Sequence, residues 1–117
     1  MASLIPATLL DAVTSTGAGA TKTGGDVAPA GSAHFGVCRT FSIMITYATA
    51  APTAATVLLQ GSHDGVSWVT LGTSTDVSTT VVKLTVVDEP FSHVRGNLSV
   101  YTAGSCTGVT ATCIGVI

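Results

Sequence analysis

The sequence predicts an all-β protein: a β-sandwich, jelly-roll-like in form, with an extended N-terminal arm. From about Phe41 onward, apolar residues recur at every second position, which is the period of a strand with one buried face. Turn-forming residues separate these segments, and signals for helix starts are nearly absent. A chain of 117 residues suits one domain with one hydrophobic core. A closed barrel is the main alternative fold.

The N-terminal third differs from the rest of the chain. Residues 15–36 are rich in Gly, Ala, Ser and Thr and carry few large apolar side chains, so this segment alone would be flexible. We therefore predict an arm over residues 1–36 and a β-sandwich domain over residues 37–117. The arm is expected to lie against the domain or a neighbouring subunit, with four anchors: Leu4, Ile5, Leu9 and Leu10. The alternative is that residues 4–13 form the first strand of the sandwich.

The clearest strand covers residues 41–47, where one face carries Phe41, Ile43, Ile45 and Tyr47. A second strand over residues 55–60 leads into a third over residues 66–71. The connection between them, residues 61–65, has turn chemistry, and Asp64 followed by Gly65 is the strongest local hairpin signal in the sequence.

Residues 80–87 and 92–101 form the next two predicted strands. The first places Val82, Leu84 and Val86 on one face and keeps a rather apolar outer face that includes Val81 and Val87. The second sets Val94, Leu98 and Val100 on one face. Within it, Gly96 indicates a bulge or the close approach of another segment.

The last predicted strand runs from Val109 to the C-terminus. One face carries Val109, Ala111, Cys113 and Ile117, and the other carries Thr110, Thr112, Ile114 and Val116. Because the chain stops within an apolar pattern, we expect this terminus to be packed against protein.

Charged residues are scarce, at 9% of the chain with a net charge of -2, against roughly a quarter in ordinary soluble domains. Much of the surface is therefore expected to face protein. Nucleic acid is not an expected partner, because the four Lys and Arg residues are scattered singly. No apolar stretch has the ~18 residues of a spanning helix, and the first residues lack a basic secretory region. We expect synthesis in the cytosol and no membrane contact.

No constellation of residues points to catalysis, a metal or a cofactor. The histidines His34, His63 and His93 lie in different segments, and the adjacent acids Asp88 and Glu89 lack the ligand spacing of a calcium loop. Neither a Gly-x-Ser-x-Gly elbow nor a GxxxxGK[ST] loop is present. We therefore predict a protein that is not an enzyme.

Three cysteines, Cys38, Cys106 and Cys113, form neither a dense disulfide framework nor a CxxC pattern. Buried, unbridged side chains are the favoured interpretation. A Cys106–Cys113 bridge stays open as an alternative if the protein reaches an oxidising compartment.

Three segments resemble small structural proteins of tailed bacteriophages. Residues 57–72 join an apolar strand, a Ser-x-Asp-Gly turn and a Trp-x-x-Leu strand, residues 90–97 contain Pro-x-x-x-Val-Arg, and residues 16–19 read Thr-Gly-Ala-Gly. The resemblance implies a virion component assembled in the host cytoplasm, with a capsid decoration (cementing) protein as the first option. Its expected partners are the major capsid protein, copies of itself, or both. The expected state is a homo-oligomer, with a trimer as one option. A tail or neck component is the next option.

Under this interpretation the expected assembly interface consists of apolar residues of the arm and of outer strand faces: Leu4, Ile5, Leu9, Leu10, Val81, Val87, Ile114 and Val116. The alternative is a carbohydrate-binding host-attachment module, which would need an exposed aromatic platform around Trp68 with Tyr47 or Tyr101. For Trp68 itself, packing in the core or against a sheet is favoured. A small hydrolase, a third option, would need two histidines and an acid within hydrogen-bond reach.

Overall fold

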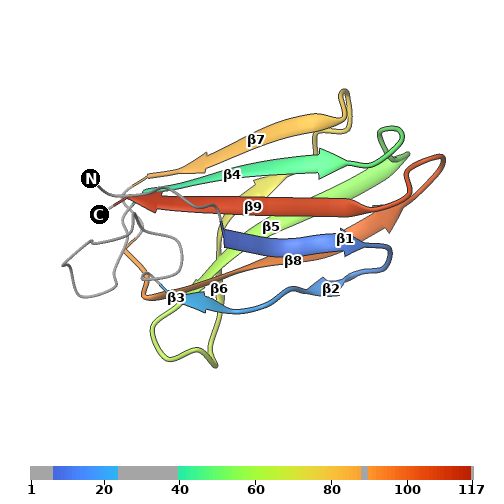
Figure 1. Ribbon diagram of the computed structural model, residues 1–117. Helices are drawn as coiled ribbons and strands as arrows, with labels where there is room; N and C mark the ends of the chain where they lie inside the picture. Colours follow the sequence, from blue (N-terminus) through green and yellow to red (C-terminus); the bar gives the residue numbers. More distant parts are fainter. Residues whose placement is uncertain (1–6, 24–39, 88–89, 117) are drawn as a thin grey trace.

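The structure is a computed structural model that describes residues 7–23, 40–87 and 90–116. The described residues form nine strands and no helix, arranged in two sheets that face each other (Figure 1). Sheet A has the order β1 (Ala7–Val13), β9 (Val109–Val116), β4 (Thr40–Tyr47), β7 (Val81–Val86). Sheet B has the order β2 (Gly17–Ala18), β8 (His93–Thr102), β5 (Ala54–Ser62), β6 (Val69–Ser74), and β3 (Lys22–Thr23) also pairs with β8. The predicted β-sandwich is confirmed.

Strands far apart in the sequence are neighbours, and all pairs are antiparallel. The first strand, β1, pairs with the last, β9, and the next two, β2 and β3, both pair with β8. In the same nested way β4 pairs with β7, and β5 pairs with β6. The contacts β4·β9 and β5·β8 join these pairs into the two sheets.

Strand β4 supplies the centre of the core on sheet A. Its alternation buries Phe41, Ile43, Ile45 and Tyr47, the face that the sequence predicts. From sheet B, β5 and β8 contribute Val57, Leu59, Val94 and Leu98 to the same core. Burying a side chain of this size stabilises the fold by about 1.5–3 kcal/mol. The packing of β4 against β5 and β8 therefore holds the two sheets together.

Two features of β8 depend on its neighbours. Gly96 lies against β1, where an added Cβ would be 3.2 Å from Leu9 Cβ and 3.3 Å from Leu10 Cγ, so the close approach predicted for this glycine is present. The bulge, in contrast, lies at Ser99, because Leu98 pairs with Val57 while Val100 pairs with Thr56.

The bulge overturns one predicted strand face. Val100 was expected beside Val94 and Leu98 in the core, but its side chain is 48% exposed. The extra residue, Ser99, reverses the alternation of the residues that follow it. Tyr101 consequently packs against the core, and its hydroxyl donates to the Cys106 carbonyl.

The N-terminal segment also differs from the predicted arm. Residues 7–13 form edge strand β1 of sheet A, and Leu9 and Leu10 are both buried in the core of their own chain. A register shift between Thr8 and Leu10 places an extra residue in β1, which lets two consecutive leucines face inward. The alternative interpretation, a first strand of the sandwich, is right for residues 7–13, and β2 and β3 extend the domain to residue 23. Residues 1–6, with Leu4 and Ile5, and residues 24–36 lie outside the described residues.

Candidate functional site

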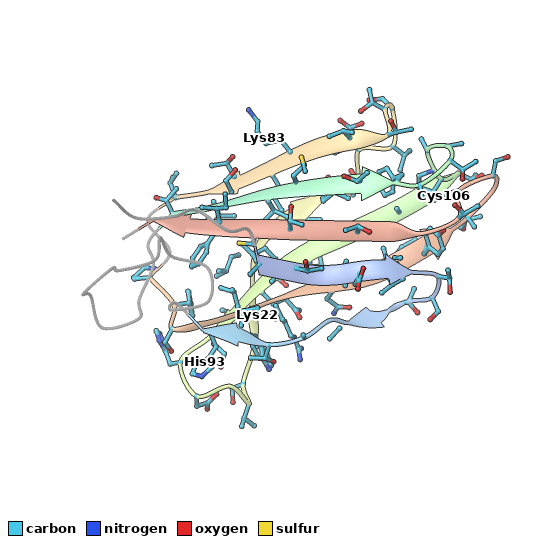
Figure 2. All side chains as sticks on the ribbon, viewed as in Figure 1. Lys22, Lys83, His93 and Cys106 are labelled. Atoms are coloured by element: carbon cyan, nitrogen blue, oxygen red, sulfur yellow. The ribbon has the colours of Figure 1, made fainter. Side chains whose placement is uncertain are left out.

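Three of the predicted interface residues, Val81, Val87 and Ile114, lie on or beside the outer side of sheet A. On β4, β7 and β9 the inward residues alternate with a second set that points away from the core. We call this set the outer A face, and it consists of Ser42, Met44, Thr46, Val81, Lys83, Thr85, Thr110, Thr112 and Ile114. Lys83 is the single charged residue in these three strands. Figure 2 shows Lys83 projecting from β7, away from the sandwich.

The predicted interface residues fall partly on this face. Val81 is 53% exposed, and Val87, which directly follows β7, is 62% exposed. Met44, which the sequence analysis did not select, is 52% exposed and lies between them and β9. Ile114 is half-buried, opposite Ser42. A groove of about 330 Å³ runs beside Met44, Val81 and Lys83. The side chain of Val116 lies outside the described residues.

The predicted β5–β6 turn is present and is organised by Asp64. Its carboxylate accepts hydrogen bonds from the Ser62 hydroxyl at 2.9 Å and from the N–H groups of Val66 and Ser67 at 2.8 Å. These hydrogen bonds lower the pKa of Asp64 to about 2, with the Ser67 N–H as the largest cause. Gly65 has a φ of +77°, which favours glycine. The hydrogen bonds from the Val66 and Ser67 N–H groups to Asp64 keep these two residues in the turn. Strand β6 therefore begins at Val69, and not at Val66 as predicted.

Trp68 packs against the outer side of sheet B and is half-buried. The guanidinium carbon of Arg95 lies 4.3 Å from the centroid of the Trp68 ring. Arg95 Nε donates to Gln60 Oε1 at 2.9 Å, and Asn97 Nδ2 donates to the same oxygen at 3.5 Å. Sheet packing, one of the two roles expected for Trp68, is therefore the one observed. The cluster was not found from the sequence because it requires Gln60 and Arg95 to be cross-strand partners.

The three aromatic residues considered for a sugar platform, Trp68, Tyr47 and Tyr101, do not lie on one surface. Arg95 covers one face of the Trp68 ring, Tyr47 is buried in the core, and Tyr101 pairs with Ala55 near the opposite end of β5 from the turn. Stacking on sugars needs rings with exposed faces on a common surface. Among these three side chains, only Trp68 lies near the turn that the resemblance singles out.

Two of the three histidines lie near this turn. The His63 ring stacks on Phe91 with centroids 4.7 Å apart, and His93 Nδ1 is 2.9 Å from the Ser92 hydroxyl. A groove of about 230 Å³ is bordered by His63, Asp64 and Phe91. In the described part of the chain, no hydrogen bond links either histidine to a carboxylate, and Asp64 is committed to the turn. His34 lies outside the described residues.

Among the described residues, no group of three or more His, Cys, Asp or Glu side chains could hold a metal ion. Cys106 and Cys113 are both buried, and no disulfide joins them. The Cys106 thiol donates to the Gly108 carbonyl at 3.3 Å. Cys38 lies outside the described residues. No helix in the part of the chain that the structure describes is long and apolar enough to cross a membrane.

Comparison with family models, curated proteins and solved structures finds no match for this chain.

Proposed function

We propose that this protein is a non-enzymatic virion structural protein, and specifically a decoration protein that cements the head of a tailed bacteriophage. Its partners would be the major capsid protein, further copies of itself, or both, with no nucleic acid or membrane involved. The observation that carries this proposal is the outer A face, where three strands present methyl and hydroxyl groups with Lys83 as their single charge.

We further infer that the sandwich belongs to the jelly-roll class. If β2 and β3 count as one interrupted strand, eight strands pair first with last, second with seventh, third with sixth and fourth with fifth. Alternate pairs then fall in opposite sheets. This is the order produced when one long antiparallel ribbon wraps around itself. Jelly rolls occur in viral capsid domains, lectin domains and cupins, so the class is compatible with virion and carbohydrate-binding functions but does not select between them and others.

The outer A face suits a cementing role for an energetic reason. Apolar area removed from water contributes about 25 cal/mol per Å², whereas charges buried at an interface must be paired to offset their desolvation. Met44 and Val81 supply apolar area, and the Thr side chains carry both a methyl and a hydroxyl group. Lys83 stands on edge strand β7, where its long side chain can cover apolar surface while its ammonium group stays in water.

The resemblance leaves a tail or neck component as an alternative placement. The carbohydrate-binding alternative depends on Trp68. The stacked Arg95 guanidinium and the positions of Tyr47 and Tyr101 weigh against a sugar platform there. We therefore place the host-attachment function behind the two virion placements.

The test uses virions produced from the genome that encodes this chain. Antibodies against the protein, applied with gold labels to purified virions, should mark the head, and mass spectrometry should give a fixed copy ratio to the major capsid protein. Labelling of the tail alone would select the tail alternative. Absence of the protein from purified virions would overturn the proposal.

A second arm of the test addresses the surface. Virions carrying Met44→Lys, on the outer A face, should lose most of the protein from the head, because the new charge must be desolvated. Thr73→Lys, on an exposed position of β6 in sheet B, is the matched control and should be retained. Thermal release of DNA should shift to lower temperature only for Met44→Lys. Equal retention of both variants would exclude the outer A face as the docking surface.

A further inference from the structure

The two sheets have four edges in the described part of the chain. The strands along these edges differ in how strongly they resist pairing with another chain. Strand β1 contains two register shifts, and β2 and β3 have two residues each. Strand β6 contains an extra residue, Leu71, between its pairings with Leu59 and Gln60. Bulges and short strands of this kind protect an edge.

Strand β7 has no bulge and is not short, so Lys83 is the one protective feature of its edge. It pairs with β4 over six consecutive residues without a register shift, and it lies at the margin of sheet A (Figure 1). Its sequence, Val-Val-Lys-Leu-Thr-Val, contains no proline or glycine and one charge. A regular, β-branched edge of this kind is a template for adding another strand.

The hydrogen-bond phase identifies which β7 groups face outward. The Tyr47 N–H donates to the Thr80 carbonyl at 2.8 Å, so Thr80 is bonded to β4. Because bonding alternates along an antiparallel pair, Val82, Leu84 and Val86 also direct their backbone groups to β4. The backbone groups of Val81, Lys83 and Thr85 therefore point to the open margin. The Thr79 hydroxyl, which donates to the Val81 carbonyl at 2.7 Å, agrees with this phase.

We propose that β7 pairs antiparallel with β7 of a second copy of this chain, across a two-fold axis perpendicular to sheet A. This axis keeps the outer A face of both copies on one side, so facing residues must share a face. The axis then lies midway between one residue and the same residue of the second copy. The two registers with most overlap are centred on Lys83 and on Leu84. They differ in the side chains that they bring together.

Charge selects the register centred on Leu84. Centring on Lys83 would place the two Lys83 side chains directly opposite each other, and like charges at such positions are destabilising. Centring on Leu84 places Lys83 opposite the second copy's Thr85, with both residues directing N–H and C=O groups into the new pairing. It also places Val81 opposite the second copy's Val87, so two of the most exposed large apolar side chains cover each other.

The result would be a continuous eight-stranded sheet, with the two outer A faces side by side. The pairing itself uses only β7 and stands apart from the capsid. The interpretation of the doubled outer A face as a docking face rests on the proposed function. The pairing itself can be tested by measuring self-association of the isolated protein, without virions. Failure of one is therefore distinguishable from failure of the other.

The experiment measures the self-association of the full chain by sedimentation velocity over a concentration series at low salt. Thr85→Glu would face Lys83 of the second copy and should lower the dimer dissociation constant about threefold. Thr85→Lys should raise it about tenfold, since two like-charge pairs form per dimer. The double variant Lys83→Glu with Thr85→Lys forms two opposite-charge pairs again, so it should lower the dissociation constant about threefold, as Thr85→Glu does. All three differences should shrink at high salt.

Thr8→Glu and Thr8→Lys are the matched controls, because Thr8 is an exposed threonine on β1, the opposite edge strand of the same sheet. Both should leave the dissociation constant unchanged. Circular dichroism and thermal unfolding check that every variant is folded. A chain that stays monomeric throughout the series would overturn the proposal. So would an oligomer whose stability does not change with the charge at position 85, or changes equally with position 8.

Discussion

Arg95 lies over the ring of Trp68, with its guanidinium carbon 4.3 Å from the ring centroid, and its Nε is held by Gln60. The contact joins the β5–β6 turn to the outer side of β8. A cation–π contact of this kind is worth about 0.5–1 kcal/mol at an exposed site. It fixes the last part of the turn to the sheet, with Asp64 organising the first part.

Replacing Arg95 should therefore loosen Trp68. We expect Arg95→Ala to lower the free energy of unfolding by about 1 kcal/mol and to shift Trp68 fluorescence to longer wavelength as the ring gains contact with water. Arg95→Lys should retain part of the effect on stability. Trp68 is the single tryptophan, so its emission reports this site alone. Unchanged emission in Arg95→Ala would contradict the contact.

Asp64 should make stability depend on pH in the acid range. The pKa of Asp64 is about 2 in the folded protein and 3.8 in the unfolded chain. The contribution of Asp64 to the free energy of unfolding is therefore fully present above pH 3.8 and is lost as the pH falls toward 2. We expect Asp64→Ala to lower the melting temperature at pH 6 and to differ less from wild type at pH 2. Asp11→Ala, at an exposed position of β1, is the control. A melting-temperature difference that is the same at both pH values would contradict the turn geometry.

The bulge at Ser99 predicts opposite outcomes for two neighbouring apolar residues. Leu98→Ala should cost about 2–5 kcal/mol, because Leu98 is fully buried. Val100→Ala should cost no more than about 0.5 kcal/mol, because its side chain is half exposed. Chemical denaturation of both variants measures these values. A large loss in Val100→Ala would mean that the strand continues without a bulge.

Gly96 should not tolerate a side chain. An added Cβ would lie 3.2 Å from Leu9 Cβ and 3.3 Å from Leu10 Cγ, so these two side chains must move by a few tenths of an ångström. We expect Gly96→Ala to destabilise the protein by about 1–3 kcal/mol, the usual cost of overpacking a core. Combining it with Leu10→Ala, which removes the Cγ and Cδ1 atoms that lie 3.3 and 3.7 Å from the added Cβ, should cost less than the sum of the two single changes. Strict additivity would show that β1 does not pack on Gly96.

Removing β1 distinguishes a core strand from an arm. Deletion through Val13 should expose the β9 edge and leave the space of Leu9 and Leu10 empty, so we expect an unfolded or aggregating protein. A shorter deletion ending at Pro6 leaves β1 in place and is the control. Recovery of a folded monomer from the longer deletion, by light scattering and circular dichroism, would favour the arm.

The sequence by itself determined the features that depend on local chemistry. The alternation of Phe41 to Tyr47 sets which face of β4 is buried, and the Asp64–Gly65 pair sets the turn, because both follow from neighbouring residues. The scarcity of charge on β4, β7 and β9 is likewise a property of the sequence, and it remains the basis of the proposed function.

Only the tertiary structure decided which strands are neighbours and where their register shifts. The burial of Leu9 and Leu10, the exposure of Val100 and the stacking of Arg95 on Trp68 all follow from pairings between distant segments. The physical reason is that side chains alternate between the two faces of a strand with a period of two. One extra residue therefore moves all the side chains that follow it to the opposite face. The position of such a residue depends on the packing of the partner strand, which a local pattern does not contain.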